Sequence, residues 1–275
     1  MSIDPTRKKA DDVEDILSDS LTVIGETPVV DSNTVTYGPL SLSIAPKARS
    51  VHWSCQANTL LADALFSPAL FLAERIERGL MSAPGLTVLE LGAGTALPSL
   101  LLSTSSPPPC LITITDYPDD NILHTLRANI AQNAGFFSPL CKVECRGYEW
   151  GQSPQALLEL IPIDRPPGYD FMVLSDLLHF DSFHDHLVGS IISLLSKLES
   201  SRVHVAAGKY TSERTCNTFL GKAASAGLVF DEILLLPDEE TWRGQMVVSG
   251  LNREDLTLRK RACRYWVGRW DLKNN

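Results

Sequence analysis

The sequence lacks long hydrophobic runs and an excess of basic residues. None of its apolar segments approaches the roughly 18 residues that a transmembrane helix needs. The polar start MSIDPTRKKADD has no hydrophobic core of a secretory signal. With 24 Lys and Arg against 33 Asp and Glu, the formal net charge is −9, which disfavours binding to a nucleic-acid backbone. We therefore expect a monomeric cytoplasmic protein, with the nucleus as the alternative, that binds neither membranes nor nucleic acid.

Paired cysteines are also scarce, which argues against a disulfide framework and a structural metal site. The six cysteines are Cys55, Cys110, Cys141, Cys145, Cys216 and Cys263. They are scattered through a chain long enough to bury a core without disulfides, so we expect reduced thiols. The only close pair is Cys141 and Cys145, and no second pair completes a tetrahedral set of metal ligands. We expect no metal.

From residue 86 onward, short apolar runs alternate with amphipathic segments. The runs predict strands at 87–91, 111–116, 142–146, 169–175, 202–207, 229–236 and 261–270. The amphipathic segments predict helices at 96–103, 121–133, 182–198 and 211–226, with Ser182 and Asp185 forming a capping box. This alternation indicates an α/β fold with a Rossmann-like, seven-stranded, mostly parallel sheet covered by helices on both faces. No clearly periodic helix separates the last strand candidates, so we expect the last strand to be antiparallel.

The first 84 residues read differently from the rest. Residues 1–20 combine a basic cluster with an acidic stretch and predict a flexible acidic tail. Residues 21–84 predict an extension that packs on the core, with a hairpin at 34–44 and a helix at 59–78 interrupted at Pro68. Residues 85–275 form the expected core.

The sharpest local signal is VLELGAGTALP, residues 88–98, a buried strand that runs into a glycine-rich turn and then a helix. Glycines there allow a ligand to approach the backbone, and the helix start offers free N–H groups. A dinucleotide site would want a third glycine where Leu97 stands, and Glu90 would repel a pyrophosphate but suits a cationic or amine-bearing ligand. A tight turn without a ligand is the alternative.

A second acidic residue, Asp116, ends the next predicted strand, 26 residues after Glu90. A carboxylate at this place can accept hydrogen bonds from both hydroxyls of a ribose. It could instead cap the following helix, although Asp119 and Asp120 compete for that role. Together with the glycine turn, Asp116 predicts a ligand that contains adenosine.

These features resemble the seven-strand S-adenosylmethionine-dependent methyltransferases, and more narrowly their lysine-methyltransferase-like branch. The resemblance rests on VHWSCQANTLLADAL, LELGAGTALPSLLL, TDYPDDNILHTLRANI, YEWG and LSDLLHF, with a weaker echo in RACRYWVGRW. The branch includes protein lysine and N-terminal methyltransferases, among them a fungal enzyme acting on translation elongation factor 1-alpha. The resemblance thus implies S-adenosyl-L-methionine as cofactor and a protein amine, such as one of an elongation factor, as substrate.

The resemblance also implies roles for the residues that match its motifs. Gly92, Ala93 and Gly94 would lie along the methionine and ribose portion of the cofactor. Asp116 would hold the ribose hydroxyls, and Trp150 would flank the adenine.

Three further residues belong to the implied cofactor site. Glu90 would support it, Ser175 would touch the cofactor from the end of the fourth strand, and Trp53 would close over it. The alternatives are structural. Trp53 and Trp150 could be buried anchors, because large aromatic side chains are usually core, and Ser175 could merely end a strand.

Asp176-Leu177-Leu178-His179 occupies the place of the branch's acidic four-residue motif, which faces the target amine and usually ends in Tyr or Phe. The resemblance implies that Asp176 is catalytic and orients the amine. His179 departs from the motif, although Phe180 follows it; it is either a catalytic base or a channel wall. The nearby His184 and His186 suggest a metal, but they lie on different faces of a helix.

The C-terminal region is basic, with Arg259, Lys260, Arg261, Arg264 and Arg269. We expect a solvated strand edge protected against pairing, with a docking patch for an acidic protein or RNA as the alternative.

Three functions compete for the whole chain. The first is N-methylation of a protein amine, the second is the same chemistry on a small amine such as nicotinamide, and the third is a non-catalytic binding module. An oxidoreductase using a nicotinamide cofactor is disfavoured by Leu97 and Glu90.

Overall fold

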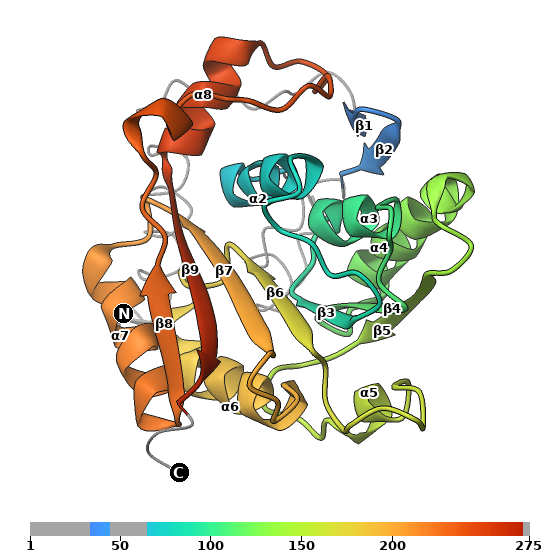
Figure 1. Ribbon diagram of the computed structural model, residues 1–275, viewed down its shortest axis with the longest axis vertical. Coiled ribbons are helices and arrows are strands. Elements are labelled where there is room, and N and C mark those ends of the chain that lie inside the picture. Colours follow the sequence, from blue (N-terminus) through green and yellow to red (C-terminus); the bar gives the residue numbers. More distant parts are fainter. Residues whose placement is uncertain (1–33, 45–64, 272–275) are drawn as a thin grey trace, which may run out of the picture.

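A computed structural model describes residues 34–44 and 65–271 and has a seven-stranded sheet at its centre (Figure 1). The strand order is β5-β4-β3-β6-β7-β9-β8. The strands are β3 (Thr87–Leu91), β4 (Leu111–Asp116), β5 (Lys142–Gly147), β6 (Phe171–Ser175), β7 (Arg202–Gly208), β8 (Leu228–Glu232) and β9 (Cys263–Trp270). All neighbours pair in parallel except β9, which is antiparallel to both β7 and β8. The predicted mostly parallel sheet with an antiparallel last strand is confirmed.

Helices cover both faces of this sheet. One face carries α2 (Ser67–Glu77), α3 (Leu97–Ser103), α4 (Asp120–Asn133) and α8 (Arg253–Arg261); the other carries α5 (Gln155–Leu158), α6 (His184–Leu194) and α7 (Glu213–Ser225). Successive strand residues point to opposite faces, so Val88 joins the first core and Leu89 the second. Strands buried on both faces explain the continuous apolar runs in the sequence. Within the described ranges, no helix is both long and apolar enough to cross a membrane.

The predicted hairpin at 34–44 is confirmed as β1 (Thr34–Tyr37) and β2 (Leu40–Ser43), and it packs on the α4 side of the sheet. Two asparagines of α4 hold it. The Ser41 backbone N–H donates to Asn133 Oδ1 over 2.9 Å, and the Ser43 N–H donates to Asn129 Oδ1 over 2.6 Å. These amides satisfy backbone donors on the outer edge of a two-stranded sheet, which would otherwise be open to pairing.

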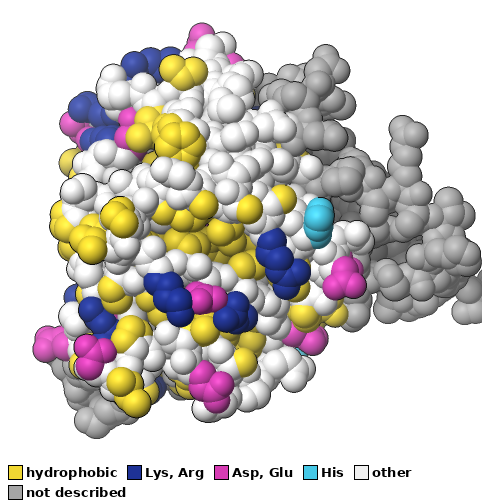
Figure 2. Space-filling view, turned by 90° about the vertical axis from the view of Figure 1, so that its right-hand side faces the viewer, with side chains coloured by type: hydrophobic (Ala, Val, Ile, Leu, Met, Phe, Trp, Pro, Cys, Tyr) yellow, Lys and Arg dark blue, Asp and Glu magenta, His cyan; other side chains and the backbone are white. Residues whose placement is uncertain are grey.

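The outer edge of the large sheet at β5 is charged. Lys142, Glu144 and Arg146 share one face of the strand and are linked by two ion pairs of 2.9 Å. Figure 2 shows the side of the molecule that carries β5, where Lys, Arg, Asp and Glu side chains lie among apolar ones. Charged residues on an edge strand oppose edge-to-edge pairing with another chain.

Several predicted boundaries are wrong for local reasons. Pro68 does not interrupt a helix but lies in the first turn of α2, where proline is compatible with helix geometry; residues 59–64 of the predicted helix lie outside the described ranges. The predicted capping box before α6 is absent, because the Ser182 hydroxyl donates to Asp181 and no side chain caps α6. The strand predicted at 229–236 ends at Glu232.

The basic C-terminal stretch is not a strand edge. The first part forms α8, a helix that the sequence analysis missed, and β9 lies between β7 and β8 in the sheet interior. Arg264 pairs with Glu232 over 2.9 Å, and Arg269 pairs with Asp231. The surface cations of β9 are therefore neutralised by the adjacent strand, which removes the basis for an acidic-partner patch there.

A buried ion pair joins α2 to α8. Lys260 Nζ lies 2.9 and 2.6 Å from the two carboxylate oxygens of Glu74, and it also donates to the Thr241 carbonyl oxygen over 3.0 Å. The two side chains are 1% and 0% exposed. Because both charges are desolvated, each depends on the other for its stability in the core.

We expect Lys260→Met to destabilise the protein by about 3–5 kcal/mol, because it leaves the buried Glu74 carboxylate with only Arg78, 3.9 Å away, as a cation. Urea unfolding measures the loss, and adding Glu74→Gln in the same chain should recover part of it. Lys222→Met is the matched control: Lys222 pairs with the exposed Asp185, where water screens the charges, so its loss should change stability little. Equal losses in the two single variants would contradict the assignment.

Candidate functional site

The residues singled out in the sequence meet at one edge of the sheet. The chain runs from β3 outward through β4 to β5, then crosses to the other side of β3 for β6 and β7. The place where the chain changes sides is the topological switch point of the sheet. Ligands of open α/β sheets bind there, outside the carboxyl ends of the strands. The glycine turn follows β3, Asp116 ends β4, and Ser175 and Asp176 come at the end of β6. The predicted site residues in the described ranges thus converge.

The two glycines of the turn after β3 serve different purposes. Both have positive φ, 56° at Gly92 and 53° at Gly94, a region that favours glycine. A Cβ added to Gly92 would lie 2.7 Å from Leu177 Cδ2 and 3.3 Å from Trp150 Cζ2, so packing excludes a side chain there. A Cβ added to Gly94 would meet no atom of the described residues within 4 Å. That part of the chain therefore leaves open space in front of Gly94, as a ligand would require.

Asp116 is tied to this turn rather than to the following helix. Its Oδ2 accepts the Gly94 N–H over 2.7 Å, and its Oδ1 accepts the Tyr117 N–H over 2.7 Å. The helix cap is Asp119, which accepts the N–H groups of Asn121 and Ile122. The side chain of Asp116 is nearly buried, and burial raises the pKa of its carboxyl group. Each carboxylate oxygen keeps a further lone pair that can accept a hydrogen bond from a ligand hydroxyl.

Glu90 lies fully buried beside Asp116. Its Oε2 accepts the Ser99 N–H over 3.3 Å, whereas Oε1 has no hydrogen-bond partner among the described residues. Burial, helped by the Asp116 carboxylate, raises the pKa of Glu90 to about 8. A buried acid with an unused oxygen is stabilised in its charged form by a nearby cation. Glu90 therefore favours a positively charged ligand at this edge.

The aromatic and hydroxyl residues of the predicted site flank the same turn. Trp150 is half-buried against Gly92 and meets Phe180 edge to face, with ring centroids 5.8 Å apart. Ser175 is half-buried at the end of β6, where it pairs with Ala206 of β7. Trp53 lies outside the described residues.

Asp176 takes up a left-handed backbone conformation, with φ of 64°. Its side chain is 6% exposed; Oδ1 accepts the Gly208 N–H over 3.3 Å, and Oδ2 accepts the hydroxyl of Tyr210. Burial raises the pKa of Asp176, while His179 and these donors oppose the rise. The sequence analysis missed Tyr210, although it follows the end of β7 and the rule for carboxyl ends could have drawn attention to it.

The His179 ring lies tilted against that of Phe180, with ring centroids 4.0 Å apart and an interplanar angle of 39°. Neither ring nitrogen has a hydrogen-bond partner among the described residues. Burial lowers the pKa of His179, so the imidazole is mainly neutral near pH 7. A neutral imidazole next to the Asp176 carboxylate can accept a proton from a bound group.

The other histidines of this region do not join His179 in a metal site. His184 is buried, with Nε2 2.8 Å from the Leu178 carbonyl oxygen, and Asp185 pairs with Lys222. Across residues 34–44 and 65–271, no group of three His, Cys, Asp or Glu side chains could hold a metal ion.

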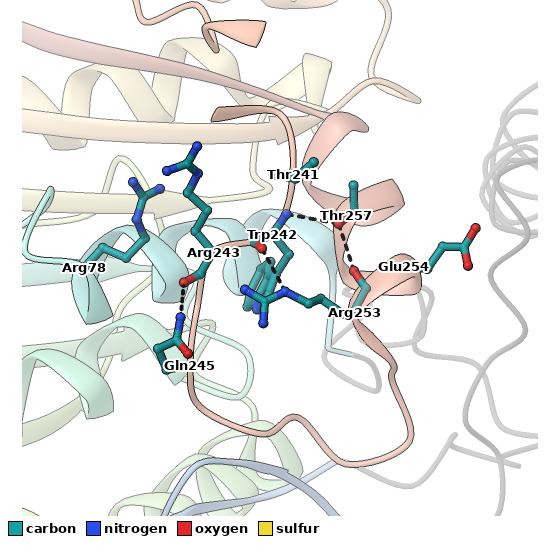
Figure 3. Close-up of a pocket in the computed structure, with 8 residues that line it drawn as sticks. All are labelled: Arg78, Thr241, Trp242, Arg243, Gln245, Arg253, Glu254 and Thr257. Atoms are coloured by element: carbon teal, nitrogen blue, oxygen red, sulfur yellow. Dashed lines mark hydrogen bonds between the residues drawn. The ribbon is translucent and has the colours of Figure 1, made fainter. Parts of the chain in front are cut away.

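A separate cavity of about 790 Å³ lies between the end of α2, the 241–245 segment and α8 (Figure 3). Figure 3 shows Arg78 and Arg243 side by side, with Arg253 near Trp242. Glu239 binds Arg78 through two hydrogen bonds of 2.5 and 2.8 Å, and Arg243 donates to the Asp238 carbonyl oxygen. None of the predicted site residues that the structure describes lines this cavity, and most of its cationic charge is already paired.

Comparison with known proteins identifies sequence relatives. The profile of a family described as lysine methyltransferase matches residues 57–225. A "Protein N-terminal and lysine N-methyltransferase EFM7" of Gibberella zeae is 32% identical over 160 residues, 56% of this chain and 58% of that protein. The protein of the same name from Yarrowia lipolytica is 35% identical over 125 residues, 41% of this chain and 44% of that protein. The matched part thus spans about half the length of these curated relatives.

Solved structures also resemble the chain. A methyltransferase from Pyrococcus furiosus aligns with a TM-score of 0.46 and 13% identity, covering 84% of this chain and 89% of that one.

We expect Glu90→Gln to stabilise the protein increasingly as the pH rises. In the parent, the Glu90 pKa is about 8 when folded and near 4.5 in the unfolded reference. Between these values the unfolded state has lost the proton that the folded state keeps, so the parent loses stability with rising pH. The gain in the variant should reach up to about 4 kcal/mol at pH 8 and shrink toward about pH 5.5.

Urea unfolding across this pH range measures the gain. Glu159→Gln, at an exposed position on the same chain, is the control and should show little change at any pH. A Glu90→Gln difference that is independent of pH would mean that Glu90 is ionised throughout.

Proposed function

Because the chain belongs to the lysine methyltransferase family, we propose that it transfers the methyl group of S-adenosylmethionine to an amine of a protein. The observation that carries the proposal is the arrangement at the carboxyl edge of the sheet. There the Asp116 carboxylate holds the open turn at Gly94, and the buried acid of Asp176 follows the neighbouring strand β6. The names of the relatives support a protein amine as acceptor, either a lysine or an N-terminus.

The residues of the turn fit this cofactor. The space in front of Gly94 admits a ligand, Asp116 can accept the ribose hydroxyls, and the unused oxygen of Glu90 favours a positive charge nearby. Trp150 would flank the adenine and Ser175 would contact the cofactor, while the closing role of Trp53 stays a prediction. S-Adenosylmethionine, when bound, would supply a methyl group on its sulfonium: the amine lone pair would form the N–C bond, and the C–S bonding pair would leave with sulfur as a neutral thioether.

The acceptor amine must lose its extra proton before its lone pair can attack. Asp176 would accept a hydrogen bond from the amine N–H and so align the nitrogen, while His179 would either take the released proton on a ring nitrogen or only line the channel. The rings of Trp150 and Phe180 lie beside this place and would lower the pKa of the amine by excluding water. A translation elongation factor is the first substrate to test.

Incubation with methyl-labelled S-adenosylmethionine and a cell lysate tests the proposal directly. Label bound to protein supports it, and an elongation factor added in purified form should then become labelled. Label found only in small molecules would instead favour a small-amine methyltransferase. Binding of the cofactor without any label transfer would favour a non-catalytic module.

Asp116→Ala should weaken binding of S-adenosylmethionine about 10- to 100-fold, because it removes charge-assisted hydrogen bonds worth about 1.5–3 kcal/mol. Calorimetry measures the affinity. Asp119→Ala is the matched control: it removes the cap of α4, costs about 1 kcal/mol of stability and should leave the affinity unchanged. Unchanged affinity in Asp116→Ala would remove Asp116 from the cofactor site.

Asp176→Asn should retain cofactor affinity and lower turnover by about 100-fold or more, because it removes the carboxylate that aligns the amine. Calorimetry and a methyl-transfer assay separate the two effects. His179→Phe should be tolerated better if His179 only lines the channel, since the related motif carries an aromatic ring there. An inactive His179→Phe with normal cofactor affinity would identify His179 as the base, whereas full activity of Asp176→Asn would move the acceptor site elsewhere.

A further inference from the structure

We propose that Tyr210 is a positioning residue for methyl transfer: from the loop after β7, its hydroxyl fixes the Asp176 carboxylate in the orientation that receives the acceptor amine. The inference rests on the proposed function. It assigns a role to a residue on a different strand from the acidic motif, so the two strand ends β6 and β7 would build the acceptor site together.

The first support is that β7 and the loop after it hold Asp176 at three points. The Asp176 N–H donates to the Ala206 carbonyl oxygen over 2.8 Å, the Gly208 N–H donates to Oδ1, and the Tyr210 hydroxyl donates to Oδ2. The left-handed conformation of Asp176 is rare for residues with a side chain, although Asp is among those that adopt it when local hydrogen bonds support it. Such a conformation persists where neighbouring contacts determine it, and here all three come from the same segment of chain.

The second support is Gly208, which lets the Tyr210 ring fold back over the strand end. A Cβ added to Gly208 would lie 2.1 Å from Tyr210 Cε1 and 2.4 Å from Tyr210 Cζ. Any other residue at this position would therefore push the ring away from Asp176. The absence of a side chain at Gly208 thus makes room for the Tyr210 ring beside Asp176.

The third support is the charge around Asp176. Two titratable side chains face its carboxylate among the described residues, His179 from its own turn and Tyr210 from the loop after β7. Burial favours the protonated acid, whereas the phenol donor favours the carboxylate. With one oxygen bound by Gly208 and the other by Tyr210, the carboxylate is restricted to one rotamer, and its remaining lone pairs are directed toward a ligand.

Tyr210→Phe removes the hydroxyl and keeps the ring. We expect kcat to fall about 10- to 100-fold, as for loss of a hydrogen bond to a charged group, with the dissociation constant of S-adenosylmethionine changed by less than about twofold. The acidic limb of the pH–kcat profile should move to higher pH, because Asp176 then takes up its proton more readily. Gly208→Ala, which displaces the ring, should produce the same pattern.

Tyr169→Phe is the matched control. The Tyr169 hydroxyl donates to the Leu157 carbonyl oxygen over 2.8 Å and accepts from the Thr113 hydroxyl over 2.9 Å, and the residue precedes β6 at the opposite end of the sheet. Its loss should reduce stability without shifting the pH profile of turnover.

Unfolding of the cofactor-free protein gives a readout independent of activity. Burial raises the pKa of Asp176 in the folded state above its unfolded value. Ionising Asp176 therefore lowers the free energy of unfolding as the pH rises. Loss of the phenol donor should make this decrease larger, because the carboxylate then has one hydrogen bond fewer. The stability deficit of Tyr210→Phe should therefore grow as the pH rises above the ordinary pKa of an aspartate, whereas that of Tyr169→Phe should stay constant. In an Asp176→Asn background, Tyr210→Phe should cause no pH-dependent deficit.

The outcomes separate this inference from the proposed function. If Asp176→Asn lowers turnover and Tyr210→Phe leaves kcat and its pH profile unchanged, Tyr210 has only a structural role and the inference is overturned. If Asp176→Asn itself keeps full turnover in a chain that methylates protein, the acceptor site lies elsewhere and the proposed role of Asp176 is lost, whatever Tyr210 does. A pH-independent deficit in Tyr210→Phe also overturns the inference.

Discussion

The hydrogen bond from the Gly94 N–H to the Asp116 carboxylate connects the end of β3 to the end of β4, and the rest of the site is arranged around that connection. It exists because the two strands pair in parallel, with Glu90 opposite Ile114, so that the residues after them reach the same edge. The parallel pairing of β3 with β6 brings Asp176 to that edge as well. Three segments distant in sequence thus contribute acids to one place through strand register alone.

This arrangement has an electrostatic cost. Glu90, Asp116 and Asp176 are all buried, and burial raises the pKa of each. Carboxylates in a desolvated place are stabilised by donors and by cations, and here the protein supplies backbone and phenol donors but no paired Lys or Arg in the described contacts. A positively charged ligand would stabilise the ionised forms of these carboxyl groups. The site is therefore less stable than an apolar edge would be, as expected where function requires polar groups in a core.

The parts of the fold that were predicted from sequence are those with a strong local signal. The strands at 87–91 and 111–116 were predicted to the residue, because fully buried parallel strands are short apolar runs that end in polar residues. Helix α8 was missed because REDLTLRKR has little apolar pattern; its capping box at Asn252 and the pairing of Lys260 with Glu74 hold it. Glu74 is far away in the sequence, as Asp176 is from Tyr210, and contacts of this kind leave no periodicity to detect.

Similar long-range contacts tie the segment between β8 and β9 to α2 and to the loop after β7. Glu74 and Glu77 of α2 accept backbone N–H groups of that segment, at Arg243 over 2.5 Å and at Met246 over 2.8 Å. Helix α8 then follows, and the carbonyl oxygen of Ala262 at its end accepts the N–H of Lys209, next to Tyr210. The loop that holds Asp176 is therefore anchored to α8, and α8 is anchored to α2 by a buried ion pair. Strand register thus brings the polar groups of β6 and β7 to this edge, and contacts that run back to α2 hold the loop after β7 against it.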